Sequence, residues 1–145
     1  MSACIFFGHR ECDQLDARVL EATIEALIQN GTECFYVGNQ GGFDGMVYNC
    51  LKRLRKVYPQ IRVSVVLAYL PVERRESEDM SDTMYPEGLE SVPPRFAIDR
   101  RNRFLLDVAE ICVCYVNHTW GGAYKYAVQA KKRGLDVISL GCVTF

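Results

Sequence analysis

The sequence has almost no net charge and no long apolar run, and each shortage excludes a class of protein. A formal charge of −1 over 145 residues gives no electrostatic attraction for nucleic acid or an anionic membrane. No stretch approaches the roughly 20 apolar residues of a membrane span, and the apolar run near the amino terminus is too short for a signal peptide. We therefore expect a cytoplasmic protein with no membrane partner and no nucleic-acid partner.

Histidine is also scarce, and the cysteines lack the spacing of a metal site. The chain has two histidines and seven cysteines, but no CxxC pair. Most of the cysteines lie in apolar, strand-like runs, where a thiol usually acts as a small buried side chain in a reducing compartment. A zinc site from His9, Cys12 and His118 is an alternative, although the usual ligand spacing is absent. We expect no metal and no cofactor.

Apolar runs alternate with amphipathic segments along the whole chain. Strands are expected at residues 3–7, 33–37, 61–70, 111–116 and 136–140, and helices at residues 13–30, 44–58, 95–109 and 122–133. Asp13 is a candidate N-cap, Gly31 and Gly134 are expected to follow helix ends, and Pro59 stops the second helix.

The predicted strands are apolar along their whole length, which is typical of a parallel sheet covered on both faces. The pattern predicts one α/β domain over residues 1–145, with a Rossmann-like, doubly wound, mainly parallel five-stranded sheet and helices on both faces. Residues 71–94 form a long loop between the third strand and the third helix. This loop is either a lid over the same sheet edge or a mobile surface loop.

Two glycine-rich stretches, GNQGGFDG and NHTWGGAYK, are each predicted to follow a strand and precede a helix. Ligands of such sheets bind beyond the carboxyl ends of the strands. The N–H groups at a helix start attract phosphate, and glycine lets the phosphate approach the backbone. Neither stretch is a Walker A or GxGxxG motif, and each alone is consistent with a simple tight turn. Together at one edge they favour a nucleotide-like ligand.

Asp44 complicates the first stretch, because a carboxylate there would repel a phosphate. Asp44 would either cap its helix or accept hydrogen bonds from ribose hydroxyls. The phosphate is then expected at Gly121 and Gly122, with Lys125 in support. Arg10 is the favoured anion partner, because it directly follows a buried strand.

These segments resemble the SLOG superfamily, which joins Smf-type DNA-processing proteins with the "Lonely Guy" phosphoribohydrolases. GGFDG resembles the glycine-rich turn of that group, with Asp44 in place of its acid. RNRFLLDVAEICVCYV resembles the Lonely Guy stretch that begins Arg-Lys, with Arg101 at the arginine, and TWGGAYKYA resembles the start of Pro-Gly-Gly-x-Gly-Thr-x-Glu. FFGHR, GGFDG and DTMYPEGLE together resemble small stand-alone bacterial members of the YpsA-like type. The resemblance implies a homodimer and a nucleotide pocket.

The sequence departs from the phosphoribohydrolases at their catalytic residues. Lys125 stands where their threonine would be, and Ala127 where their glutamate would be. Cleavage of an N-glycosidic bond needs a placed carboxylate. Glu87, Glu90 or Asp44 would substitute only if a loop placed one of them at the scissile bond. The missing acid argues against the family's reaction.

The function expected from the sequence is binding of a nucleotide or nucleotide-derived ligand, as a sensor or sequestering module. The alternative is a nucleotide or nucleoside hydrolase of altered mechanism, with His9 or His118 as general base. Tyr85 or Trp120 would stack on a base. The expected ligand-binding residues are Gly8, His9, Arg10, Gly38, Gly41, Gly42, Asp44, Tyr85, Arg101, Asn102, Trp120, Gly121, Gly122 and Lys125.

Overall fold

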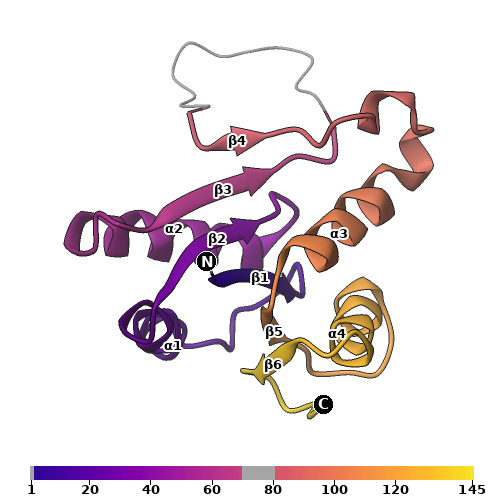
Figure 1. Cartoon of the computed structure of the whole chain (residues 1–145). Helices are drawn as coiled ribbons and strands as arrows, with labels where there is room; N and C mark the ends of the chain where they lie inside the picture. Colours follow the sequence, from indigo (N-terminus) through magenta and orange to yellow (C-terminus); the bar gives the residue numbers. More distant parts are fainter. Residues whose placement is uncertain (1, 70–80) are drawn as a thin grey trace.

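The computed structural model describes residues 2–69 and 81–145, and its strands form one parallel sheet (Figure 1). The strands are β1 (Ser2–Gly8), β2 (Thr32–Val37), β3 (Arg62–Val66), β4 (Thr83–Met84), β5 (Ile111–Tyr115) and β6 (Asp136–Ser139). Their order across the sheet is β4-β3-β2-β1-β5-β6, and every neighbouring pair is parallel. The predicted Rossmann-like α/β class is confirmed.

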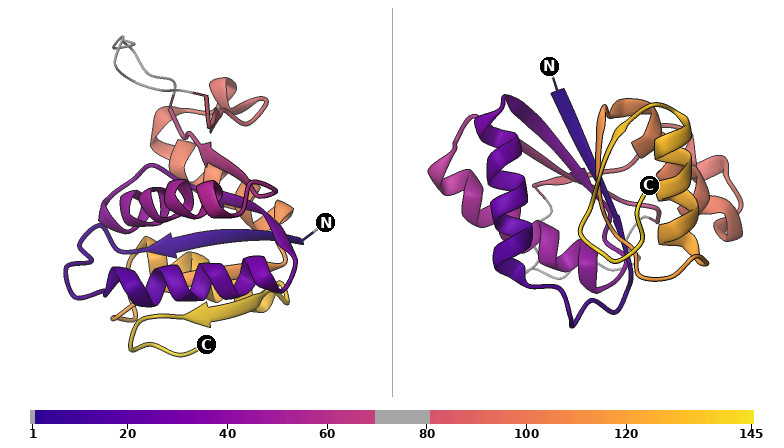
Figure 2. Two further views of the ribbon diagram at one scale, coloured as in Figure 1. Left: turned by 90° about the vertical axis from the view of Figure 1, so that its left-hand side faces the viewer. Right: turned by 90° about the horizontal axis from the view of Figure 1, so that it is seen from below.

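Helices from the described part of the chain cover both faces of the sheet (Figure 2). The helices are α1 (Ala17–Gln29), α2 (Gly42–Val57), α3 (Ala97–Val108) and α4 (Gly122–Lys132), with short 3₁₀ turns at Leu89–Ser91 and Pro94–Phe96. Helices α1 and α2 pack on one face, and α3 and α4 on the other. The chain builds outward from β1 to β4 and then returns through α3 to β5, beside β1. The switch point of the sheet therefore lies between β1 and β5.

Strand β1 shows why the strands are apolar on every residue. Cys4 and Phe6 belong to the apolar cluster under α1 and α2, whereas Ile5 and Phe7 belong to the cluster under α3 and α4. All four side chains are buried, with at most 6% of their surface exposed. Alternate side chains of a strand point to opposite faces, so a sheet covered on both faces needs apolar residues throughout.

Among the described residues the sheet has six strands where the sequence predicts five, because β4 adds an edge beside β3. Leu67 N–H donates to the Met84 carbonyl oxygen at 2.8 Å, and Val65 N–H donates to that of Asp82 at the same distance. Arg55 also holds the Asp82 carboxylate from α2, at 2.8 Å. A two-residue strand is too short to leave a periodic pattern in the sequence. The candidate lid, residues 71–94, is therefore described only in part. Residues 81–94 include β4 and pack on the rest of the domain, and residues 70–80 lie outside the described residues.

The three residues expected to mark helix ends do so, but α1, α2 and α3 each begin at another residue than expected. Gly31 and Gly134 follow α1 and α4 with φ of 103° and 85°, as expected after helix ends, and α2 ends before Pro59. The N-cap of α1 is Asp16, however, and not Asp13. The Asp16 side chain accepts a hydrogen bond from Arg18 N–H at 2.8 Å. Within the described residues, no helix has the length and apolar character needed to cross a membrane.

Candidate functional site

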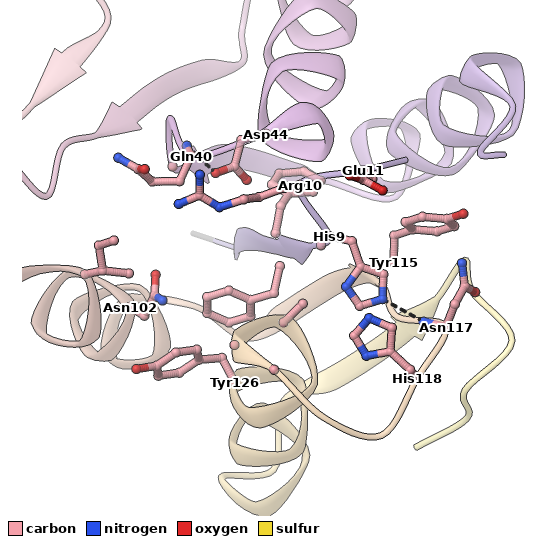
Figure 3. Close-up of a pocket in the computed structure, with 18 of the residues that line it drawn as sticks. His9, Arg10, Glu11, Gln40, Asp44, Asn102, Tyr115, Asn117, His118 and Tyr126 are labelled. Atoms are coloured by element: carbon pink, nitrogen blue, oxygen red, sulfur yellow. Dashed lines mark hydrogen bonds between the residues drawn. The ribbon is translucent and has the colours of Figure 1, made fainter. Parts of the chain in front are cut away.

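A cleft of about 840 Å³ lies at the switch point, beyond the carboxyl ends of β1 and β5. The loops after β1, β2 and β5 and the inner sides of α3 and α4 line it (Figure 3). Predicted ligand-binding residues in the lining are Gly8, His9, Arg10, Gly38, Asp44, Arg101, Asn102, Trp120, Gly121 and Gly122. The loops after β1, β2 and β5, which carry most of the predicted ligand-binding residues, therefore meet at one cleft. The role of these residues in binding stays a prediction.

The start of α2 is closed by the loop that follows β1. Gly42 N–H donates to the Arg10 carbonyl oxygen at 2.8 Å, and Phe43 N–H donates to that of His9 at 3.3 Å. A Cβ atom on Gly42 would lie 2.5 Å from the Arg10 oxygen, and one on Gly41 would lie 2.7 Å from Arg10 Cα. Neither Gly41 nor Gly42 lines the cleft. These two glycines let two backbones touch, and the N–H groups of Gly42 and Phe43 already have hydrogen-bond partners.

The start of α4 is open. Within the described residues, the N–H groups of Gly122, Ala123 and Tyr124 make no hydrogen bond, and no side chain caps the helix. A Cβ atom on Gly122 would have no neighbour within 4 Å. Gly121 and Gly122 line the cleft, and the first turn of α4 contains no acidic residue. The partial positive charge of this helix start therefore faces open space in the cleft.

Asp44 and Arg101 meet beside Gly38 on the α2 side of the cleft. A Cβ atom on Gly38 would lie 2.6 Å from Arg101 Nη1 and 2.8 Å from Asp44 Oδ2, so only glycine leaves room for both groups. Arg101 is 3% exposed; its Nη1 donates to the Val66 carbonyl oxygen and its Nε to Asn102 Oδ1. Helix α3 thus delivers a fixed guanidinium to the cleft.

Asp44 lies in the first turn of α2, where its Oδ2 accepts a hydrogen bond from Gln40 N–H at 2.9 Å. It is therefore not the N-cap, a position that Gly41 occupies. Burial raises the pKa of the Asp44 carboxyl to about 6, and the Gln40 hydrogen bond and the guanidinium groups of Arg101 and Arg10 oppose this only in part. Figure 3 shows Arg10 extending towards Gln40 and Asp44.

The two histidines form a stacked pair on the opposite side of the cleft, with ring centroids 4.1 Å apart (Figure 3). His9 Nε2 accepts a hydrogen bond from Asn117 N–H at 2.9 Å, so its basic nitrogen is engaged. Burial and the neighbouring His118 lower the pKa of His9. His118 Nδ1 lies 2.8 Å from the Trp120 carbonyl oxygen, and Nδ1 must therefore carry the proton that it donates. Within the described residues, the nitrogen of the pair whose lone pair accepts no hydrogen bond is therefore Nε2 of His118.

Two other predicted residues do not line the cleft. Tyr85 follows β4 and packs against the cluster under α1 and α2. The Lys125 ammonium lies 3.4 Å from Asp99 Oδ1, which also receives the hydroxyl of Tyr126. The sequence predicts Lys125 in the first turn of the fourth helix. It does not predict that the Asp99 carboxylate lies beside the Lys125 ammonium group, where it competes with a phosphate.

The structure adds residues that sequence reasoning missed. Asn117 ties the loop after β5 to His9 through its N–H group, and its Oδ1 accepts from Cys142 N–H at 2.9 Å. Tyr126 lines the cleft from α4. The position of Asn117 directly after an apolar strand was a usable signal, whereas the contacts of Tyr126 depend on how α3 and α4 pack.

Neither a metal site nor the phosphoribohydrolase acid is formed by the described residues. Among residues 2–69 and 81–145, no group of three His, Cys, Asp or Glu side chains is placed to hold a metal ion. Ala127 is fully buried in the cluster under α3 and α4 and does not line the cleft. A carboxylate at this position would face apolar side chains instead of a ligand.

Comparison with protein families gives a match that covers most of the chain. No curated protein matches the chain. A family model described as the YspA SLOG family matches residues 4–137, which include the three cleft loops and both glycine-rich helix starts. The chain therefore belongs to the SLOG family.

Proposed function

We propose that the chain binds a nucleotide or nucleotide-derived ligand, with its phosphate on the N–H groups at the start of α4. The observation that carries this proposal is the open helix start at the cleft: three N–H groups that have no partner among the described residues, and a Gly122 with room for a Cβ atom. A phosphate oxygen accepts several such N–H groups at once, and the helix dipole favours its negative charge. The SLOG family is one of nucleotide-related Rossmann-like domains, which supports the same assignment.

The cleft is larger than a phosphate requires. Its volume of about 840 Å³ is within the range of roughly 300–1,000 Å³ for small-molecule sites. Asp44 offers carboxylate oxygens on the α2 side, which suits the hydroxyl groups of a ribose. Arg10 is exposed and is placed to pair with a further anionic group of the ligand.

We assign a sensing or sequestering role because Ala127 stands where the phosphoribohydrolases have their catalytic glutamate. The alternative function is hydrolysis, and a specific observation favours it. Asp44 is a cleft carboxyl with a pKa raised to about 6 by burial, close to the value that suits a general acid or base near neutral pH. Glu87 and Glu90, the other carboxyls considered from the sequence, do not line the cleft.

Thermal shift and product analysis together test these two functions. The wild-type chain is incubated with nucleoside monophosphates, NAD-derived nucleotides and cyclic dinucleotides, and each mixture is then analysed for free base and sugar phosphate. A raised Tm without product supports the binding role. Release of base or sugar phosphate, abolished in Asp44→Asn, would establish the hydrolase instead.

Gly122→Asp tests the phosphate position within the same assay. The added carboxylate projects into open space at the start of α4, so the fold is retained while a phosphate is repelled. Gly45→Asp is the matched control, because Gly45 also lies in the first turn of a helix, has no neighbour within 4 Å of a Cβ atom, and is outside the cleft lining. We expect Gly122→Asp to lose the ligand-induced shift and Gly45→Asp to keep it. Equal shifts in both variants would place the phosphate elsewhere.

The resemblance also implies a homodimer, and we include it in the proposal. Light scattering coupled to size-exclusion chromatography tests it directly. A mass near twice 16.5 kDa is expected, and a mass of one chain would remove the dimer from the account.

A further inference from the structure

Three aromatic rings form a continuous stack beside the start of α4. The Trp120 and His118 ring centroids are 3.7 Å apart with planes inclined by 13°, and those of His118 and His9 are 4.1 Å apart with planes inclined by 22°. Tyr115 meets the far end of the stack edge-on, at 5.9 Å from His9. The stack therefore runs from the buried end of β5 to the mouth of the cleft.

Hydrogen bonds hold the inner two rings in place. His9 Nε2 accepts from Asn117 N–H, and His118 Nδ1 is 2.8 Å from the Trp120 carbonyl oxygen. Because one face of the Trp120 indole lies on His118, most of its exposed surface must belong to the other face and the edges. That exposure is 68%, and Trp120 lines the cleft. The chain thus presents a large aromatic face whose orientation is fixed before any ligand arrives.

We propose that the outer face of Trp120 is the platform on which the ligand's nucleobase stacks. The proposal rests on the proposed function and identifies the ligand class more narrowly: the ligand carries a planar heterocycle and a phosphate close enough to occupy neighbouring positions. Trp120 directly precedes Gly121 and Gly122, so the platform and the open helix start are adjacent. A sugar phosphate fills only the second position.

The other aromatic side chains of the cleft lining offer no comparable surface, and His9 and His118 lie inside the stack. Phe6, Phe7, Tyr115 and Tyr126 are each at most 6% exposed. Tyr126 also donates its hydroxyl to Asp99. Tyr85, the second stacking candidate from the sequence, lies outside the lining. Within the described residues, Trp120 is thus the cleft aromatic with a free face.

Trp120 is also the one tryptophan of the sequence, so its fluorescence reports on this platform alone. We expect AMP to change its emission on titration and to raise Tm. Ribose 5-phosphate should raise Tm by less and leave the emission unchanged. CMP should bind more weakly than AMP, because a smaller ring overlaps the indole less.

Trp120→Ala separates stacking from phosphate binding. Loss of one base–aromatic stack weakens affinity for AMP by about tenfold, while affinity for ribose 5-phosphate stays unchanged. Trp120→Phe should recover most of the lost affinity, and Phe96→Ala, which removes an aromatic ring 50% exposed outside the cleft lining, should change neither.

Two results would overturn the platform. If AMP raises Tm but leaves the emission unchanged and binds Trp120→Ala as tightly as the wild type, the base lies elsewhere, and the phosphate site stands. If Gly122→Asp binds AMP and ribose 5-phosphate like the wild type, the phosphate site fails, and the adjacent platform fails with it.

Discussion

The starts of α2 and α4 have similar glycine-rich sequences but differ in hydrogen bonding and in charge. At α2, the N–H groups of Gly42 and Phe43 are taken by carbonyl oxygens of the loop after β1, and Asp44 supplies a negative charge in the first turn. At α4, the first three N–H groups are unbonded within the described residues, and the first turn has no acid. Glycine at the first start permits packing, whereas glycine at the second leaves space for a ligand.

The largest expected effect is at the closed start. In Gly42→Ala the new methyl group would lie 2.5 Å from the Arg10 carbonyl oxygen, so the loop after β1 must move and its hydrogen bond to α2 is lost. We expect the free energy of unfolding to fall by about 3 kcal/mol, as in overpacked sites. Urea denaturation measures this directly. A variant as stable as the wild type would show that the two backbones need not touch.

The sequence predicts the features of this fold that depend on local patterns. It does not predict those that depend on contacts between residues far apart in the chain. The alternation of strands and helices, the helix ends at Gly31 and Gly134 and the meeting of three loops at one sheet edge all follow from local patterns and general sheet topology. The bonding of each helix start does not, because it depends on which distant carbonyl oxygen reaches it. The sequence therefore identified both glycine-rich loops and, because of Asp44, favoured the second for a phosphate, but it could not show that the loop after β1 occupies the N–H groups of the first.

Long-range contacts also explain the remaining differences. Strand β4 is two residues long and exists because β3 and Arg55 hold the segment around Asp82. Lys125 was predicted to support a phosphate, but Asp99 from α3 lies 3.4 Å from its ammonium group. In each case the deciding partner is remote in sequence and carries no local signal.

The next expected effect is on the pH dependence of stability, and it comes from Asp44 in the first turn of α2. Because burial raises the pKa of Asp44 to about 6 from 3.8, the folded chain binds its proton more tightly than the unfolded chain. The contribution of Asp44 to the stability of the wild type should therefore fall as pH rises from about 4 to 7. Asp44→Asn keeps an oxygen for Gln40 N–H and should remove this pH dependence, gaining up to about 3 kcal/mol at pH 7.

Urea denaturation at several pH values gives the free energy of unfolding of the wild type and of Asp44→Asn. Because the two proteins differ only at residue 44, the difference between their curves reports the titration of Asp44. The two curves should converge towards pH 4. Parallel curves across the whole range would mean that Asp44 titrates normally.

The smallest effect is at the open start. Gly122→Ala adds a methyl group where no atom lies within 4 Å and φ is compatible with any residue. Reduced freedom of the unfolded chain should raise the free energy of unfolding by about 0.5 kcal/mol. A clear loss of stability, measured by the same denaturation, would mean that the start of α4 is packed and not open.

The most direct measurement of the central claim follows the backbone N–H signals of both helix starts by NMR during titration with ribose 5-phosphate. We predict that the signals of Gly122, Ala123 and Tyr124 shift to lower field as they donate to the phosphate, while those of Gly42 and Phe43, already bonded to Arg10 and His9, stay in place. Shifts at Gly42 and Phe43 with none at the start of α4 would contradict the account.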